Sequence, residues 1–283
     1  MAFMTMMREA AIRLWLGVVA CWLAVPGSVA EQAAEPRGDS SGVELTIAAA
    51  SELDPALAEV ARAFEEKTGK HVTLKFAESS GLYSQIRKGS AFDAFFPADM
   101  NDVRRLAASG LAVDTSITEY ARDELVLCIS PMVRVEFPPR NPLVAVRQKA
   151  ISRIAVADAQ RTAAGKAAVE ALKAVRAYDV SVRRKILVGE NLAQAAHFEE
   201  NGNSDVALLT MSTTRAYPLG GTQVMAIASN LYRPIRMEAV VVTRSKHRRE
   251  ALEFLRFAAS PPGQAIFTRY GFREPKGRTV QRH

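Results

Sequence analysis

The sequence predicts an α/β protein made of two successive series of strands and helices, and three observations lead to this fold class. Short apolar runs with a period of two alternate with segments whose apolar residues recur at helical spacing. The alternation breaks at the proline-bearing stretch 137–139 and then resumes. Roughly 240 residues follow the N-terminal leader, enough for one large or two modest domains with a core. Such alternation predicts mostly parallel sheets flanked by helices, with ligands at the carboxyl ends of the strands.

Residues 1–30 are typical of a secretory signal peptide. Two arginines precede a short apolar run, and Ser28-Val29-Ala30 matches a small-x-small cleavage site. The stretch VVAC ending at Cys21 also loosely resembles a lipobox, so a lipid anchor at Cys21 stays an alternative. Residues 31–42 are small and polar, which predicts a flexible leader.

The first series contains the junction AAASELDP, which ends a strand and begins a helix. We expect Asp54 to cap this helix with Pro55 at its first position, and Gly69 to end it. Ser51 then lies in the turn ahead of the helix with its hydroxyl free to face outward. The same patterns predict strands at 43–47, 71–76 and 91–96 and helices near 53–64, 82–86 and 101–109.

The apolar run 125–129 predicts a strand that leads to the proline-bearing stretch, and the second series follows it. This series predicts strands at 154–157, 185–188 and 206–209 and helices at 166–177 and 192–199. A last strand is predicted at 237–243, followed by helices at 249–258 and 262–270. Once the signal is removed, Cys128 is the remaining cysteine, so no internal disulfide forms, and its apolar run predicts a small core residue.

Composition and motifs point away from nucleic acid, metal and catalysis. The net charge is +7, but the basic residues are scattered and form no stripe interleaved with aromatic residues. The four histidines have no second ligand at metal spacing. Catalytic and phosphate-loop motifs such as GxSxG, GxGxxG and GK[ST] are missing from the expected positions. We therefore expect a binding protein rather than an enzyme.

Five segments in order resemble the periplasmic molybdate-binding proteins of ABC importers. They are AAAS, FEEKTG, AESSGLYSQIRKGSAFDAFFPAD, AAGKAAVEAL and SPPGQAIFTRYGF, which extend the likeness from about Val43 to Phe272. The resemblance implies a type II periplasmic-binding-protein fold with two α/β lobes joined by two crossover strands, near 124–129 and 236–241. Lobe 1 is then expected at 43–124 plus 240–283 and lobe 2 at 125–239.

The resemblance also implies a site in which a tetrahedral dianion is held without a cation. Its expected ligands are the hydroxyls of Ser51 and Ser79, which contact the oxygen atoms of molybdate without coordinating the metal, and the backbone N–H groups of Ala164 and Leu192. Thr210 is expected at the site as well: it stands where many family members have a tyrosine, and it keeps a hydroxyl on a shorter side chain. The competing interpretations are a satisfied turn hydroxyl at Ser51, a helix cap at Ser79 or Ser80, and ordinary solvated helix starts at Ala164 and Leu192.

Two carboxylates limit this assignment. Glu52 and Glu78 adjoin the two serines, and a carboxylate facing a dianion is costly in a cleft of low dielectric. We expect both to point to solvent; if they do not, a ligand other than molybdate stays an alternative.

The functional expectation is a periplasmic protein that delivers molybdate, and tungstate too, to an ABC permease. It is expected to act as a monomer without a cofactor and without nucleic acid. The alternatives are a binding protein for a different oxyanion or small organic acid, and a non-transport interaction protein on the same fold.

Overall fold

The structure is a computed structural model that describes residues 42–138, 140–217 and 219–275. The predicted signal peptide, the lipid anchor at Cys21 and all of the leader but Gly42 lie outside the described residues.

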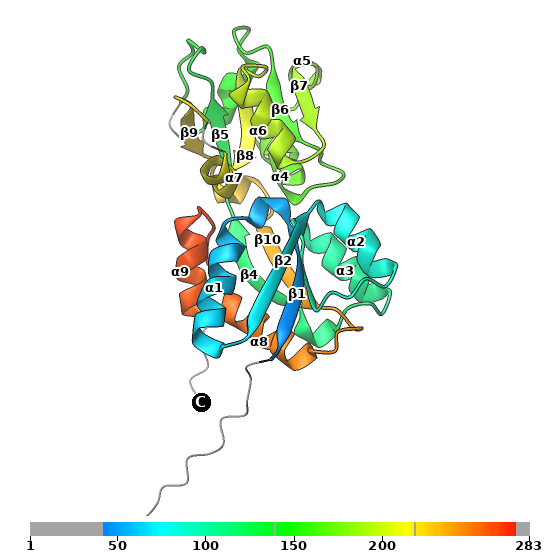
Figure 1. Ribbon diagram of the computed structural model, residues 1–283. Coiled ribbons are helices and arrows are strands. Elements are labelled where there is room, and N and C mark those ends of the chain that lie inside the picture. Colours follow the sequence, from blue (N-terminus) through cyan, green and yellow to red (C-terminus); the bar gives the residue numbers. More distant parts are fainter. Residues whose placement is uncertain (1–41, 139, 218, 276–283) are drawn as a thin grey trace, which may run out of the picture. The chain divides into compact units, whose positions relative to one another are not determined.

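In the described part of the chain, the strands form two mixed sheets of five strands each (Figure 1). The first sheet has the order β2-β1-β3-β10-β4, with β1 at Glu44–Ala50, β2 at His71–Ala77, β3 at Ala94–Phe96, β4 at Thr118–Asp123 and β10 at Ile235–Val241. The second has the order β7-β6-β8-β5-β9, with β5 at Leu125–Ile129, β6 at Ile154–Ala157, β7 at Ile186–Gly189, β8 at Val206–Thr210 and β9 at Gln223–Ala226.

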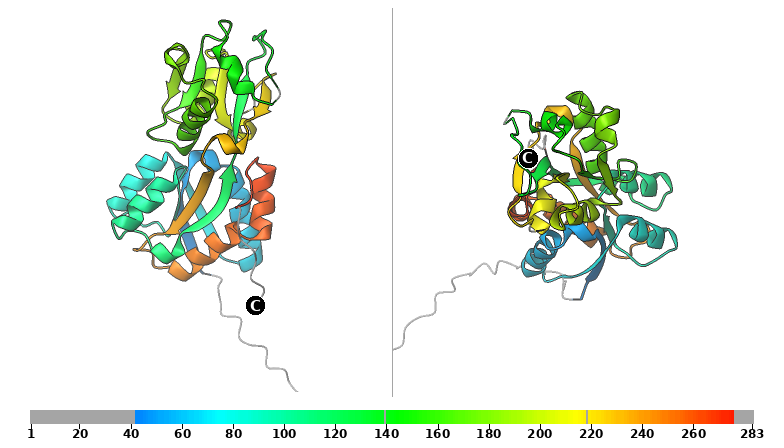
Figure 2. Two further views of the ribbon diagram at one scale, coloured as in Figure 1. Left: turned by 180° about the vertical axis from the view of Figure 1, so that it is seen from behind. Right: turned by 90° about the horizontal axis from the view of Figure 1, so that it is seen from above.

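Both sheets combine parallel and antiparallel pairing. β1 runs parallel to β2 and β3, whereas β10 runs antiparallel to β3 and β4. In the second sheet β6 is parallel to β7 and β8, and β5 is antiparallel to β8 and β9. Figure 2 shows β4 and β10 side by side from behind.

The helices follow the strands along the chain. They are α1 (Ala56–Thr68), α2 (Ser79–Arg87), α3 (Met100–Ala108), α4 (Ala163–Ala174), α5 (Val180–Arg183), α6 (Leu192–Glu200), α7 (Met211–Ala216), α8 (Arg248–Ala258) and α9 (Pro261–Arg269), with short 3₁₀ turns at η1 (Ser51–Leu53), η2 (Asp114–Ser116), η3 (Pro142–Arg147) and η4 (Ser229–Leu231).

Strand β1 shows why the first sheet is covered on both faces. Leu45 and Ile47 point to one face, where they pack in one cluster with Phe64 of α1 and Phe254 of α8. Ala48 belongs to the cluster on the other face, which contains apolar residues of α2 and α3. Because side chains alternate along a strand, one short apolar run supplies both halves of the core. Figure 1 shows α1 and α9 on one side of the sheet and α2 and α3 on the other.

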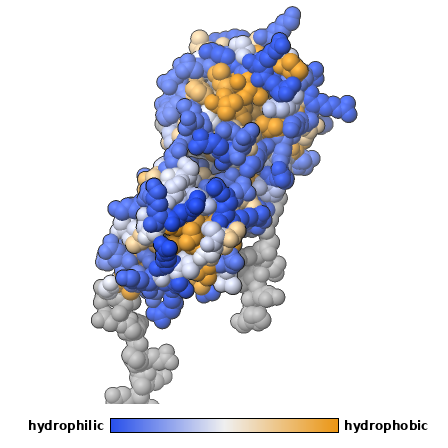
Figure 3. Space-filling model, turned by 90° about the vertical axis from the view of Figure 1, so that its right-hand side faces the viewer, coloured by the Kyte–Doolittle hydropathy of each residue, from blue (hydrophilic) through white to orange (hydrophobic). Residues whose placement is uncertain are grey.

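The second sheet has its own core, in which α4 and α6 pack against the strands. Cys128 is fully buried there, which confirms its expected place as a small core residue. Apolar surface is nevertheless exposed on the side that carries α5 and β7, which Figure 3 shows, and Val180 and Val188 are exposed side chains of these two elements.

Two passages of the chain join the sheets. Glu124 alone separates β4 from β5, and the chain returns from β9 in the second sheet to β10 in the first. The expected lobe limits at 124/125 and 239/240 stay a prediction, although all of β10, from Ile235, pairs within the first sheet.

Several boundaries differ from those expected. Pro55, not Asp54, is the N-cap residue of α1, and no side chain caps this helix. Helix α2 begins at Ser79, three residues before the helix expected near 82–86. Helix α4 begins at Ala163, three residues earlier than expected, since Thr162 accepts a hydrogen bond from the Gly165 N–H and so supplies the cap. Gly69 ends α1 in the left-handed conformation, as predicted.

Candidate functional site

The candidate site is a pocket of about 370 Å³ that residues of both sheets line. At about 30 Å³ for each water in the liquid, it has room for about a dozen waters, more than one tetrahedral oxyanion needs. All five residues expected at the site line this pocket: Ser51, Ser79, Ala164, Leu192 and Thr210. Their contact with a ligand stays a prediction, but the fold brings them together from five separate elements.

Three helices direct their N-termini at the pocket. Residues of the first turns of α2, α4 and α6 line it, the first helix following the first sheet and the others the second. The first N–H groups of a helix have no intrahelical partner and lie at the positive end of its dipole. Three such ends therefore supply N–H donors and partial positive charge from both sheets.

The caps of α4 and α6 leave particular donors free. Thr162 engages the N–H of Gly165, and Asn191 engages the N–H of Gln194, at 2.9 Å in both cases. Within the described ranges no hydrogen bond pairs the N–H of Ala164 or Leu192. These two groups are the ones that the resemblance assigns to the ligand, and both side chains are buried beneath the pocket.

The two serines occupy different local settings. Ser51 opens the 3₁₀ turn η1 directly after β1, and it is exposed. Its backbone carbonyl accepts the Asp54 N–H at 3.2 Å. Ser79 is the first residue of α2, and its Oγ accepts the N–H of Ala98 at 3.0 Å, so its own O–H is available as a donor. Neither hydroxyl caps its helix, which removes the capping interpretation for Ser79.

Thr210 is almost fully buried, and its hydroxyl is engaged. Oγ1 lies 2.8 Å from the Thr213 hydroxyl and accepts the Thr213 N–H at 3.4 Å as the cap of α7. Tyr217, seven positions later, lines the pocket as well. Position 210 has no phenol, but Tyr217 at the end of α7 supplies one to the pocket. The sequence did not predict this contribution.

Glu52 and Glu78 face the pocket, so the expectation that both point to solvent was wrong. Glu52 is half-buried inside η1, and the turn directs its side chain inward because Leu53 packs into the core beside it. Glu78 is exposed, but its Oε1 accepts a hydrogen bond from the Asn191 side chain of the opposite sheet's α6 cap. The spacing of residues in the sequence did not predict that these carboxylates face the pocket, because the short η1 turn has no periodic apolar pattern.

Asp123 is a further carboxylate that lines the pocket, and sequence reasoning missed it. Burial raises the pKa of Asp123 to about 6, against hydrogen bonds from Ser212, Thr210 and the Glu124 N–H that lower it. Burial also raises the pKa of Glu52 to about 7, and the negative charges of Asp123 and Glu78 add to the increase. Glu52 therefore holds a proton to higher pH than an exposed glutamate does.

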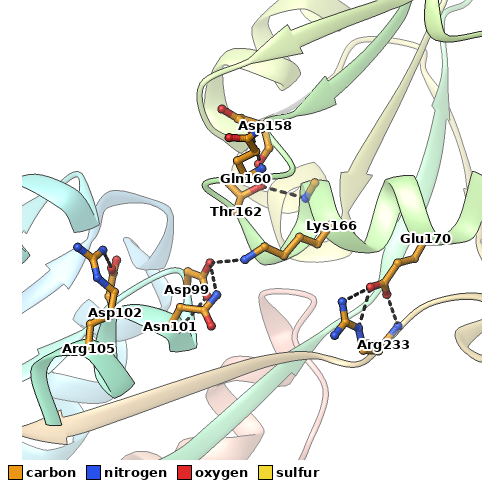
Figure 4. Close-up of polar contacts among 11 residues, drawn as sticks. Asp99, Asn101, Asp102, Arg105, Asp158, Gln160, Thr162, Lys166, Glu170 and Arg233 are labelled. Carbon is orange, nitrogen blue, oxygen red and sulfur yellow. Dashed lines mark hydrogen bonds and ion pairs between the residues drawn. The ribbon is translucent and has the colours of Figure 1, made fainter. Parts of the chain in front are cut away.

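The cations near the pocket have carboxylate partners of their own. Lys166 of α4 pairs with Asp99, the cap of α3, at 3.6 Å, and this ion pair connects the two sheets' helices (Figure 4). Arg105 pairs with Asp102 at 3.1 Å. Arg161 lies 4.0 Å from Glu190. The pocket thus offers an anion neutral donors, and each of these three cations has a carboxylate partner.

Two further observations bear on function. No group of three or more His, Cys, Asp or Glu residues within residues 42–275, the gaps at 139 and 218 aside, is placed to hold a metal ion. In the same part of the chain no helix has the length and apolar character needed to cross a membrane.

Comparison with known proteins decides the family. The family model described as bacterial extracellular solute-binding protein matches residues 45–273, most of the chain. The chain belongs to this solute-binding family. Membership confirms the class indicated by the five sequence segments and implies an extracytoplasmic location.

Named relatives of this solute-binding protein agree with that assignment. It is 30% identical over 233 residues to the molybdate-binding protein ModA of Rhodobacter capsulatus, covering 82% of the chain and 89% of the relative. It is 26% identical over 234 residues to ModA of Azotobacter vinelandii, covering 82% and 91%. The solved periplasmic molybdate-binding protein of Azotobacter vinelandii matches with a TM-score of 0.69 at 23% identity, covering 82% and 100%. That structural likeness confirms the predicted fold.

Proposed function

We propose that this protein captures molybdate, and tungstate too, in the pocket between its two sheets and delivers the anion to the membrane permease of an ABC importer. The observation that carries the proposal is the convergence of three helix N-termini, from both sheets, on the pocket that Ser51 and Ser79 line. The names of the relatives, which are molybdate-binding proteins, support the choice of anion.

The physical basis is a ring of neutral donors. A hydrogen bond to a charged group contributes about 1.5–3 kcal/mol net, so several converging donors offset the loss of hydration. The donors proposed here are the hydroxyls of Ser51 and Ser79 and the N–H groups of Ala164 and Leu192. Because they come from both sheets, neither side supplies the full set, and ligand binding favours the arrangement in which the two sides meet.

A different oxyanion or a small organic acid is the second candidate, and the carboxylates favour it. Glu52, Glu78 and Asp123 line the pocket and suit a ligand that carries a proton donor. The volume also exceeds the needs of a bare tetrahedral anion. Asp123 is already held by Ser212, however, which leaves fewer acceptors for such a ligand.

Titration calorimetry separates the two candidates. The mature protein is titrated at pH 6 with molybdate, tungstate, sulfate and phosphate. Strong heats with molybdate and tungstate are expected. No heat with molybdate, together with clear binding of another solute, would refute the assignment of molybdate as the ligand. A thermal-shift screen tests the interaction-protein alternative, because the melting temperature of a binder rises with its ligand.

The remaining features belong to the same proposal. We propose export by the signal at residues 1–30, action as a monomer, and binding without catalysis or cofactor. Mass spectrometry of the protein from the membrane fraction tests the alternative of a lipid at Cys21, since cleavage before this residue and an added acyl mass mark a lipoprotein.

A further inference from the structure

Glu52 and Asp123 place two carboxyl groups inside a pocket proposed to receive a dianion. They come from different elements, Glu52 from η1 after β1 and Asp123 from the end of β4. Their charges act on each other, since Asp123 contributes to the raised pKa of Glu52. A doubly charged ligand beside two ionised carboxylates is unfavourable, so the pair has to lose charge when the pocket fills.

The hydrogen bonds of the two groups are unequal. Asp123 accepts the Ser212 hydroxyl, the Glu124 N–H at 2.8 Å and the Ser212 N–H at 3.3 Å, and Thr210 adds to these. Within the described residues, no side chain or backbone group of another residue donates to the Glu52 carboxyl. Hydrogen bonds to a carboxylate favour its ionised form. The proton therefore belongs on Glu52 and the charge stays on Asp123.

The other charged and titratable groups around Glu52 do not neutralise it. Glu78, at the cap of α2, adds negative charge. Among the described residues, the buried phenol of Tyr120 on β4 has no hydrogen-bond partner, and Tyr217 lines the pocket as a neutral phenol. The cations around the pocket, Arg105, Arg161 and Lys166, pair with Asp102, Glu190 and Asp99.

We propose that Glu52 is a specificity-determining residue that is a neutral carboxylic acid in the loaded protein and donates its proton in a hydrogen bond to the bound oxyanion. Capture of each dianion then takes up one proton from solvent, which ends on the Glu52 carboxyl. This inference rests on the proposed function. Ionised Glu52 would repel the bound anion, whereas neutral Glu52 donates one more hydrogen bond to it.

The size of the effect follows from ordinary titration. With a free-protein pKa of about 7, Glu52 is about 90% protonated at pH 6 and about 10% protonated at pH 8. The affinity of the wild-type protein for molybdate is therefore expected to fall about tenfold between pH 6 and pH 8. At pH 8, binding is expected to take up about 0.9 proton for each molybdate.

Calorimetry with molybdate at pH 8, in two buffers with different ionisation enthalpies and without phosphate or sulfate, measures the proton directly. The wild-type protein is expected to show the uptake above. Glu52→Gln is expected to bind with uptake reduced to less than 0.3 proton and an affinity that changes less than threefold between pH 6 and pH 8. Glu66→Gln, which removes an exposed carboxylate on α1 outside the pocket, is the control and is expected to behave as the wild type.

The outcomes are distinct. Molybdate binding by the wild type at pH 8 without proton uptake overturns the inference and leaves the proposed function intact. Loss of binding in a folded Glu52→Gln protein also overturns it, because the ligand then needs a carboxylate acceptor. Absence of molybdate heat in the wild type at both pH values refutes the proposed function itself. The wild-type measurement needs no variant, so the test does not depend on whether Glu52→Gln folds.

Discussion

Glu52→Gln is also expected to stabilise the ligand-free protein, by an amount that depends on pH. In the folded chain burial and neighbouring charge raise the pKa of Glu52 from 4.5 to about 7, so folding disfavours its ionised form. Between these two values the folded state holds a proton that the unfolded state releases, and stability therefore falls as pH rises. The cost is absent below pH 4.5 and complete above pH 7. At about 1.4 kcal/mol for each pH unit it reaches about 3 kcal/mol.

Glutamine keeps the shape of the side chain but cannot ionise. Glu52→Gln is therefore expected to unfold at a temperature about 6–12 °C above the wild type at pH 8, and close to it at pH 4.5. Scanning calorimetry of both ligand-free proteins from pH 4.5 to 8.5 measures the difference, with Glu66→Gln, an exposed carboxylate on α1 outside the pocket, as the control. Parallel melting curves for wild type and Glu52→Gln across this range would refute the reasoning, because the carboxyl would then titrate alike in both states.

Three further changes test the site and its frame. Ser51→Ala is expected to weaken molybdate binding by about 1–3 kcal/mol in calorimetry with little change in melting temperature; a lower melting temperature with unchanged binding would show that the hydroxyl is structural. Gly165→Ala would place a Cβ 2.2 Å from the Ala157 carbonyl oxygen. The free energy of unfolding, measured by urea denaturation, is therefore expected to fall by about 1–3 kcal/mol. Gly81→Ala is the control, because a Cβ there meets no atom of the described residues within 4 Å. Lys166→Met removes the ion pair with Asp99, which is partly exposed and is worth at most about 1 kcal/mol. Molybdate release is therefore expected to become up to about fivefold faster in stopped-flow measurements. Unchanged release would show that the pair does not hold the two sides together.

Much of the fold could be predicted because local rules act on neighbouring residues. Strand β6 at Ile154–Ala157 matches its predicted range, and α6 begins at the predicted residue, Leu192. Both have a regular apolar period and clear flanking residues, so neither needs information from distant parts of the chain. The start of α1 was predicted less well, because Asp54 does not cap it and the intervening η1 turn has no periodic signature.

The sequence by itself indicated five of the residues that line the pocket, through its resemblance to a known family. Ser51 and Ser79 lie together because each follows one of two neighbouring parallel strands, whose carboxyl ends meet at one edge of the sheet. The sequence also indicated the family, through segments whose order extends over most of the chain. Tertiary structure alone decided the electrostatics. Whether Glu52 faces solvent or ligand depends on how η1 turns after β1, and Asp123 enters the pocket because β4 ends where the chain crosses to the second sheet. The pKa values of both groups depend on burial and on charges distant in sequence, and no local pattern contains that information.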